Sequence, residues 1–498
     1  MSQIGLPVGW VLANYADVYL SASNGTGGSQ NKEGVGIPVS RIETIANETI
    51  DYSRIGYLAE YEESKVEKHK LNFGDILFSH INSPIHLGKT AIYDGLQPLY
   101  HGINLLRIVV DREVVLPEFF DAHCRYIRAL GLFSLNAQHA VNQSSLNQKK
   151  LGSFELPLPP LAEQQIIIDK LDSLLAQVES IKTRLERIPE ILKQFRQSVL
   201  AAAVSGKLTE EWRRINTNHV RQDIYFIDKY WENEYKKNNK KYKKIEYPKS
   251  DFDLSVFPDN WVKTNVGRVF DVYVGATPSR QREEFWNGEI NWVSSSEVAF
   301  CRIRSTKENI TNEGYKSTST TIHPVGTVML AMIGQGKTRG QAAILDIEAC
   351  HNQNTAALRV PEKIANSEFL YFYLLYKYEE TRQMGSGNNQ QAMNKAIVQG
   401  LEFPLPPFEE QIEIVDKIES LFEYIERVER QVQVALDRVS NLTQSILAKA
   451  FRGELTAEWR ETNPELISGE HSAEALLGRI KAERELAKPA TKRGRGKA

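Results

Sequence analysis

The sequence predicts a mixed α/β protein in which two globular α/β domains are joined by two long helices. Three observations carry this prediction: an internal duplication, a heptad pattern in both duplicated segments, and short apolar runs between turns elsewhere. The two helices are expected to form an intramolecular, antiparallel coiled coil. A chain of 498 residues has room for several domains, and the order domain, helix, domain, helix gives a pseudo-two-fold repeat.

The duplication is clearest between residues 156–213 and 403–460. The first segment opens LPLPPLAEQ and closes GKLTEEWR, and the second opens FPLPPFEEQ and closes GELTAEWR. Aligned without a gap, 23 of their 58 positions are identical, which is far more than chance. The regions before each segment correspond more faintly, for example at His101 and His351. These matches indicate that the chain arose by duplication of a unit of about half its length.

Both copies carry apolar residues at alternating spacings of three and four, which is the heptad pattern of a coiled coil. One such helix leaves an apolar stripe uncovered, and a second related helix in the same chain can cover it. Pairing between separate chains is the alternative. Gly206 and Gly453 favour helix ends, and Pro189, which has no counterpart in the second copy, predicts a kink. The predicted core residues are Ile167, Leu171, Leu174, Val178, Ile181, Leu185, Ile414, Ile418, Leu421, Ile425, Val428 and Val432.

Short apolar runs in the two remaining regions predict strands and helices. The clearest are strands at Asp75–Phe78, Thr90–Tyr93 and Leu105–Val110 and helices at Leu116–Leu130 and Ser367–Tyr378. The predicted parts of the chain are a first α/β domain (1–155), a first long helix (156–213), a lysine-rich connector (214–256), a second α/β domain (257–402), a second long helix (403–460), and a C-terminal helix with a basic tail (461–498).

The connector contains six lysines and no acidic residue in the ten residues 235–244. A solvated linker and a non-specific contact with phosphate groups are both consistent with this composition.

Charge and cysteine content exclude several classes of protein. With 61 basic and 63 acidic residues the net charge is −2, so any contact with nucleic acid must come from local patches. Three widely separated cysteines exclude a disulfide framework and favour a reducing compartment. Neither a signal peptide nor an apolar run long enough to span a membrane is visible. A cytoplasmic protein without a membrane partner is expected.

No motif in the chain predicts a catalytic centre or a metal site. Residues 331–338, AMIGQGKT, match the loose spacing of a phosphate-binding loop, but the residues after Lys337 and Thr338 predict a strand instead of the required helix. No methyltransferase motif is present, and the adjacent Cys350 and His351 favour core packing. A nucleotide-binding enzyme is therefore the weakest alternative.

Polar side chains that can read bases or hold phosphates cluster in presumed loops of both halves. Asn and Gln can bond adenine, Arg can bond guanine, and Lys and Arg anchor phosphates. For each residue alone, an ordinary surface position is the alternative. The candidate DNA-binding residues are Ser79, His80, Asn82, Lys89, Gln138, Asn142, Gln143, Arg280, Arg282, Gln335, Lys337, Arg339, Asn388, Asn389 and Gln390.

The paired helix openings and endings resemble the specificity subunit of a Type I restriction–modification enzyme. So do the run Gly74-Asp75-Ile76-Leu77 and the segment GATPS leading to WNGEINW (275–292). The resemblance covers nearly the whole chain. It implies that each α/β domain is a target recognition domain that reads one half of a split, asymmetric DNA site. It also implies that the coiled coil sets the spacer between the half-sites and docks two modification subunits.

The same resemblance implies the partners and their cofactors. Modification subunits use S-adenosylmethionine to methylate adenine in double-stranded DNA, and restriction subunits use ATP and magnesium for translocation and cleavage. The chain itself is expected to bind no cofactor and to be non-catalytic, as part of a defence against foreign DNA. A coiled-coil adaptor whose end domains bind proteins or sugars is the alternative reading.

Overall fold

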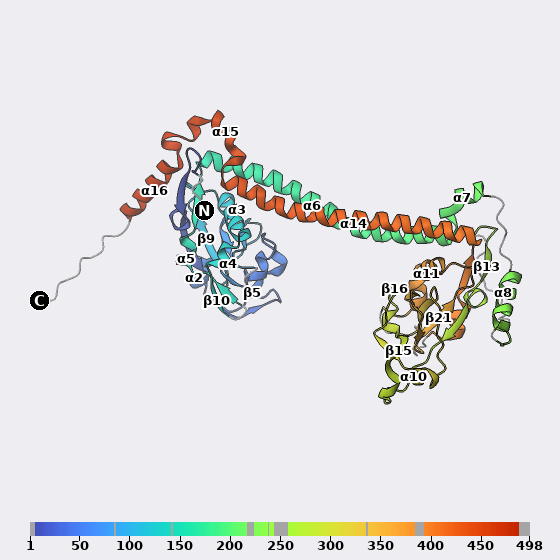
Figure 1. The fold of residues 1–498 in the computed structure, drawn as a ribbon. Helices are drawn as coiled ribbons and strands as arrows, with labels where there is room; N and C mark the ends of the chain where they lie inside the picture. The colour runs from blue at the N-terminus through green and yellow to red at the C-terminus, as the bar shows by residue number, and fades with distance from the viewer. Residues whose placement is uncertain are drawn as a thin grey trace. The chain divides into compact units, whose positions relative to one another are not determined.

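The computed structural model describes residues 5–83, 86–140, 143–216, 224–237, 239–243, 257–334, 337–383 and 393–487. The chain forms two compact units, of which the first contains residues 1–186 and 433–498 and the second residues 187–432. Each unit holds one α/β domain and a portion of both long helices, α6 (Leu161–Val204) and α14 (Phe408–Phe451) (Figure 1).

The first α/β domain is built on a four-stranded antiparallel sheet in the order β2-β9-β6-β8. Helix α3 packs on it and contributes Phe119, Phe120 and Cys124 to the core. The strands are β1 (Val11–Asn14), β2 (Tyr19–Asn24), β3 (Gln30–Asn31), β4 (Ile37–Val39), β5 (Gly56–Leu58), β6 (Ile76–Phe78), β7 (Ile81–Asn82), β8 (Thr90–Ile92), β9 (Leu106–Val110), β10 (Gln138–Ala140), β11 (Gln143–Ser145) and β12 (Glu155–Leu158). The helices are α1 (Tyr15–Val18), α2 (Glu63–Val66), α3 (Pro117–Ala129), α4 (Leu132–Leu135) and α5 (Gln148–Gly152).

The second α/β domain repeats this plan on a five-stranded sheet in the order β14-β21-β18-β19-β16. Helix α11 packs on it through Phe369, Leu370 and Tyr373. The strands are β13 (Val262–Asn265), β14 (Asp271–Val274), β15 (Trp286–Val293), β16 (Cys301–Ile303), β17 (Glu308–Ile310), β18 (Val328–Ala331), β19 (Ala342–Leu345), β20 (Cys350–His351), β21 (Thr355–Arg359) and β22 (Glu402–Leu405). The helices are α9 (Val266–Val269), α10 (Asn312–Lys316), α11 (Ser367–Tyr376), α12 (Tyr378–Gln383) and α13 (Lys395–Gly400).

The duplication predicted from the sequence extends to strand register. In the first domain β1 pairs antiparallel with β12, from Val11 opposite Leu158 to Asn14 opposite Glu155. In the second, β13 pairs with β22 in the same way, from Val262 opposite Leu405 to Asn265 opposite Glu402. The strands and the helix predicted in the first domain are present, with no end shifted by more than one residue. The helix predicted at Ser367–Tyr378 of the second domain divides into α11 and α12. The predicted mixed α/β architecture is confirmed.

Within each unit the portions of α6 and α14 pack against each other in antiparallel order. In the first unit Ile167 and Leu171, near the start of α6, share a core with Ile446 and Leu447, near the end of α14. In the second unit the relation is reversed, since residues from Val199 to Val204 share a core with Ile414, Val415 and Ile418. The intramolecular pairing predicted from the heptads is therefore confirmed in both units.

Most of the predicted core positions are buried, but one is not. Ile181 is 46% exposed, so its assignment to the buried seam is wrong. A straight α-helix has 3.6 residues per turn, so an apolar stripe with a period of 3.5 drifts around the helix axis. In addition, each helix of a pair covers only one face of the other, so an apolar residue that has drifted off that face is exposed. Ten others are buried or pack partly buried against a core: Ile167, Leu171, Leu174, Val178, Leu185, Ile414, Ile418, Leu421, Ile425 and Val432; Val428 is half-buried.

The helix ends agree with the glycine signals, and α6 continues through Pro189 as one helix. Gly206 and Gly453 adopt left-handed backbone conformations, with φ of 75° and 72°, just after the last residues of α6 and α14. A side chain at either position would be strained there. The kink expected at Pro189 stays a prediction.

A buried glutamate joins the start of α6 to the chain beyond the end of α14. Glu163 accepts hydrogen bonds from Trp10 Nε1 (2.8 Å) and from Thr456 Oγ1 (2.6 Å), and it pairs with Arg460. Arg460 also donates to the carbonyl of Gly453 (2.7 Å). Trp10 belongs to the first domain, so one carboxylate holds three segments together.

The equivalent glutamate of the second unit makes an equivalent junction. Glu410 accepts hydrogen bonds from Thr209 Oγ1 (2.8 Å) and from Asn260 Nδ2 (3.2 Å), and it pairs with Arg213. In this copy Trp261 is buried but does not reach the carboxylate, and Asn260 takes its place. Each long helix is thus fixed at its start to the end of the other.

The glutamine that follows each of these glutamates ties the helix to its domain. Gln164 donates to the carbonyls of Val114 (2.8 Å) and Pro159 (2.9 Å) and accepts from the amide of Leu116 (2.8 Å). Gln411 makes the same three bonds with Ile364, Pro406 and Asn366. These bonds give the Glu-Gln pair at the start of each long helix a specific structural role.

Two further helices follow each long helix. After α6 come α7 (Glu210–Ile215) and α8 (Ile224–Lys237), and after α14 come α15 (Ala457–Thr462) and α16 (Ala473–Ala487). The connector is therefore not a solvated linker throughout, because Ile227 and Trp231 of α8 are buried. None of the helices that the structure describes combines the length and hydrophobicity needed to cross a membrane.

We expect Ile414→Asp to destabilise the second unit by about 3 kcal/mol, because it places a carboxylate in an apolar seam without a partner. Ile414 is fully buried, whereas Ile412, two residues earlier on the same helix, is 40% exposed. Ile412→Asp is therefore the matched control and should change stability by less than about 0.5 kcal/mol. Chemical denaturation of both variants measures the difference. Equal destabilisation would contradict the helix pairing.

Candidate nucleic-acid interface

The polar cluster predicted in the first domain is assembled around a small sheet in the order β10-β11-β7. Ser144 of β11 lies opposite Asn82 of β7, and the amide of Leu146 donates to the carbonyl of His80 at 2.9 Å. Residues more than 50 positions apart in the sequence therefore meet at one place. The segment from Ser79 to Asn82 thus lies next to β11, which pairs with β10 at Gln138. These polar residues were expected in loops, but Asn82, Gln138 and Gln143 belong to strands.

A chain of polar side chains runs beside this sheet. Asn24 Nδ2 lies 3.3 Å from His80 Nε2, and Gln148 Nε2 donates to Asn24 Oδ1 at 2.9 Å. Burial lowers the pKa of His80 to about 4, so the ring is neutral at pH 7 and can accept a hydrogen bond from the Asn24 amide. Sequence reasoning missed Asn24, because only the fold brings its side chain to His80.

The other candidates of the first domain differ in how accessible they are. Gln138 is exposed, whereas Ser79 and His80 are buried, which gives these two a supporting role in the described structure. Lys89 donates through Nζ to the carbonyl of Ala46 at 2.6 Å, so its ammonium group already has a structural partner. Asn142 lies outside the described residues, and the side chains of Asn82 and Gln143 are not described.

Two arginines of the second domain form exposed ion pairs beside aromatic rings. The Arg280 guanidinium pairs with Glu308 through two hydrogen bonds and lies 3.7 Å from the centre of the Trp286 ring. The hydrogen bonds with Glu308 raise the pKa of Arg280 further above its usual range. Arg282 pairs with Glu284 at 2.6 Å. Both arginines lie near solvent, but each has a carboxylate partner.

Two further candidates of the second domain, Lys337 and Arg339, lie in another loop. Lys337 is exposed and Arg339 half-buried in the loop between β18 and β19. A turn and then strand β19 follow Lys337, so this loop lacks the helix that a phosphate-binding loop requires. The hydroxyl of Tyr378 donates to the Lys337 carbonyl at 2.6 Å. Gln335, Asn388, Asn389 and Gln390 lie outside the described residues.

A close backbone approach holds the base of the equivalent loop in each domain. The amide of Thr26 donates to the carbonyl of His101, and the amide of Ala276 donates to that of His351, both at 3.0 Å. A Cβ atom on the neighbouring Gly25 or Gly275 would collide with the same histidine carbonyl, so only glycine fits. Burial lowers the pKa of both histidines to about 4. The histidines matched in the sequence are therefore neutral structural supports.

Comparison with known proteins identifies the family. The profile of the Type I restriction modification DNA specificity domain matches residues 29–190 and 258–436. The chain belongs to the family of Type I restriction enzyme specificity subunits. It is 30% identical over 521 aligned residues to the EcoKI specificity subunit of Escherichia coli strain K12, an alignment that covers 97% of each chain. It is also 36% identical to the StySPI specificity subunit of Salmonella potsdam, over 90% of this chain and 94% of that one.

Solved structures agree with this family. A crystal structure of the HsdS subunit from Thermoanaerobacter tengcongensis superposes with a TM-score of 0.58 and 19% identity, covering 91% of this chain and 99% of that chain. A chain from a study of complex assembly and conformational transition of the type I R-M system gives a TM-score of 0.60 and 18% identity, with 90% and 99% covered. This specificity subunit thus shares their fold. The alternative of an adaptor for non-DNA partners is not favoured.

Proposed function

We propose that each recognition domain of this specificity subunit reads one half of a bipartite, asymmetric site in double-stranded DNA. The observation that carries the proposal is that two domains of one plan present unlike polar groups. The first offers the exposed Gln138 and the Asn24–Gln148 amide pair, and the second offers Arg280 and Lys337. Amides suit adenine and arginine suits guanine, so one chain can read two unlike half-sites.

In the second domain, Arg280 is our principal candidate for direct base reading. Its pair with Glu308 is solvent-exposed, and exposed pairs contribute only about 0–1 kcal/mol. Replacing this carboxylate by the acceptor edge of guanine as the partner of Arg280 therefore costs little free energy. The ring of Trp286 holds the guanidinium plane in place by cation–π contact. Lys337 supplies a phosphate contact that carries no sequence information.

The two long helices serve as the spacer between half-sites and as the docking site for two modification subunits. Their pseudo-symmetry supports the recruitment of two copies of one partner. Exposed apolar side chains on both helices support a protein partner, because such surface is costly to leave in water. These side chains are Ile181, Ile191, Phe195, Tyr424, Val434 and Leu442.

The chemistry belongs to the partner subunits in this proposal. Modification subunits bind S-adenosylmethionine and methylate adenine, and restriction subunits use ATP and magnesium to translocate and cleave DNA. The specificity subunit carries out no reaction and holds none of these cofactors. Its contribution is to place the modification subunits on a chosen sequence.

The methylated sequence of host DNA tests this function. The chain is expressed with its modification subunit, and N6-methyladenine is mapped and compared with cells that express the modification subunit alone. We expect one split motif, with two half-sites and a fixed spacer, only when this chain is present. A stoichiometric complex with an active modification subunit that adds no motif would overturn the proposal.

A further inference from the structure

Each recognition domain carries a docked helix that the sequence places outside it. Helix α8 lies on the second domain, with Ile227 and Trp231 buried, and α16 lies on the first, with Leu477 and Ile480 buried. We call α8 and α16 the docking helices. They follow equivalent junctions in the duplicated chain, and each contacts its domain at the short helix after the first strand, α9 or α1. The two docking sites are therefore equivalent.

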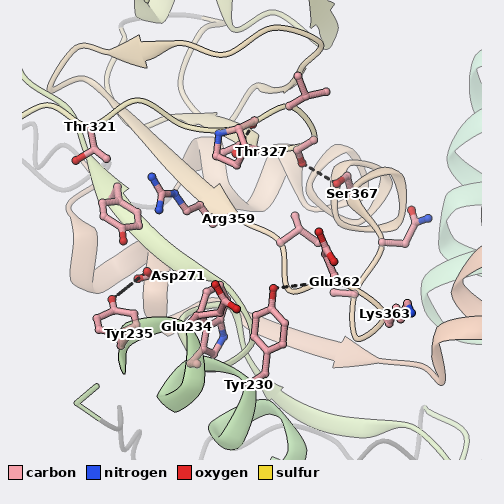
Figure 2. A pocket seen from close by; sticks show the side chains of 18 of the residues that line it. Tyr230, Glu234, Tyr235, Asp271, Thr321, Thr327, Arg359, Glu362, Lys363 and Ser367 are labelled. Carbon is pink, nitrogen blue, oxygen red and sulfur yellow. Dashed lines mark hydrogen bonds between the residues drawn. The ribbon is translucent and has the colours of Figure 1, made fainter. Parts of the chain in front are cut away.

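The contacts of α8 centre on a mostly buried ion pair. Asp228 accepts two hydrogen bonds from the guanidinium of Arg268, at 3.0 and 2.8 Å. Trp231 Nε1 donates to the carbonyl of Val269 at 2.9 Å, and the Tyr235 hydroxyl bonds the carboxylate of Asp271. Figure 2 shows Tyr235 directed at Asp271 and, nearby, Tyr230 of the same helix beside the turn after β21. An acidic group of the helix thus meets a basic group of the domain.

The contacts of α16 have the opposite polarity. Lys481 pairs with Asp17 at 3.1 Å, and Arg484 donates to the carboxylate of Asp111 and to the carbonyl of Asp17, both at 2.9 Å. Arg479 lies 3.8 Å from Glu113 in the turn after β9, which corresponds to the turn after β21 in the second domain. Here basic groups of the helix meet acidic groups of the domain.

The charge is of opposite sign at equivalent positions of the two domains. Asp17 is the third residue of α1 and Arg268 the third residue of α9, and each follows the strand that pairs with the strand before a long helix. If α16 occupied the second site, Lys481 would meet Arg268. If α8 occupied the first site, Asp228 would meet Asp17. Like charges placed together in a partly buried interface oppose association.

We infer that these opposite charges make each recognition domain select its own docking helix. The docking site of the second domain fits an amphipathic helix with an acidic residue at the position of Asp228. The docking site of the first domain fits one with basic residues at the positions of Lys481 and Arg484. The duplication created two similar sites within one chain, so without such a distinction either helix could occupy either site. The recognition module is therefore the domain together with its docking helix.

Charge reversal in the full-length chain tests this selection. We expect Asp228→Lys to raise the hydrogen-exchange rate of the α8 amides roughly 100-fold, because it removes a bidentate partner and adds a like charge beside Arg268. Glu232→Lys, at an exposed position of the same helix, is the matched control and should leave exchange within about twofold. Asp228→Asn is a milder variant that remains informative if Asp228→Lys impairs expression.

The combined reversal separates charge recognition from general damage. Asp228→Lys with Arg268→Asp should bring α8 exchange back to within a few-fold of the native rate, and Lys481→Asp with Asp17→Lys should do the same for α16. If the combined variants exchange as fast as the worse single variant, or if Asp228→Asn and Asp228→Lys behave like Glu232→Lys, charge does not select the helix. Hydrogen exchange is measured without DNA or partners, so these outcomes do not depend on the proposed function.

Discussion

Glu163→Ala is expected to lower the stability of the first unit by about 3–5 kcal/mol, the cost typical of removing one partner from a buried ion pair. The change leaves Arg460, Thr456 and the Trp10 indole without the carboxylate that accepts their hydrogen bonds. Glu163 is fully buried, so water cannot replace the carboxylate without opening the junction. The expected effect is among the largest for a single substitution in this chain.

Hydrogen exchange and thermal unfolding measure this effect. Exchange should increase first in α15, which carries Arg460, and in the segment around Trp10. Glu179→Ala is the control, because Glu179 lies on the same helix with a side chain 68% exposed. It should change the midpoint temperature of thermal unfolding by less than about 2 °C. Glu410→Ala should act in the same way on α7 in the second unit. A Glu163→Ala variant as stable as Glu179→Ala would show that the junction is not structural.

The long helices could be predicted because their evidence is local and repeated. Spacings of three and four residues persist through both copies, and the start and end signals agree with them. The one error, at Ile181, has a physical origin, since heptad periodicity does not say where two paired helices stop covering each other. The same locality explains why the pairing of β1 with β12 was not predicted, because these strands lie more than 140 residues apart.

The candidate interface was predicted only in part, because residue types indicate which side chains can bond bases but not which residues contact those side chains. Polar runs at corresponding places in both halves indicated Gln138 and the segment from Ser79 to Asn82 as candidates, but their meeting at one small sheet depends on the fold. The Asn24–Gln148 bond spans 124 residues and the Arg280–Glu308 pair spans 28, so neither has a local signal. Helix α8 was missed for a different reason. The lysines at its end suggest a solvated segment, although Ile227 and Trp231 earlier in the helix are buried.

Replacing residues 257–402 with the recognition domain of another specificity subunit is expected to change one half-site completely and leave the other unchanged. The expectation rests on the proposed reading of one half-site by each domain. The first domain has its own sheet, its own core and its own docking helix α16, and the exchange alters none of them. Mapping N6-methyladenine in host DNA gives both half-sites in one measurement. A change in both half-sites would contradict the two-reader proposal.

We expect the charge at the position of Arg268 to determine which donor domains give an active chimera. A donor with a basic residue there keeps the pair with Asp228, whereas a donor with an acidic residue faces Asp228 with a like charge and should give a complex that methylates poorly. Extending the exchange to residues 224–402 brings the donor's own docking helix and should restore methylation. If the two exchanges methylate equally well with an acidic donor, then recognition between helix and domain has no effect on function, even though the half-sites still follow the domain. The spacer should stay constant in every active chimera, because α6 and α14 are unchanged.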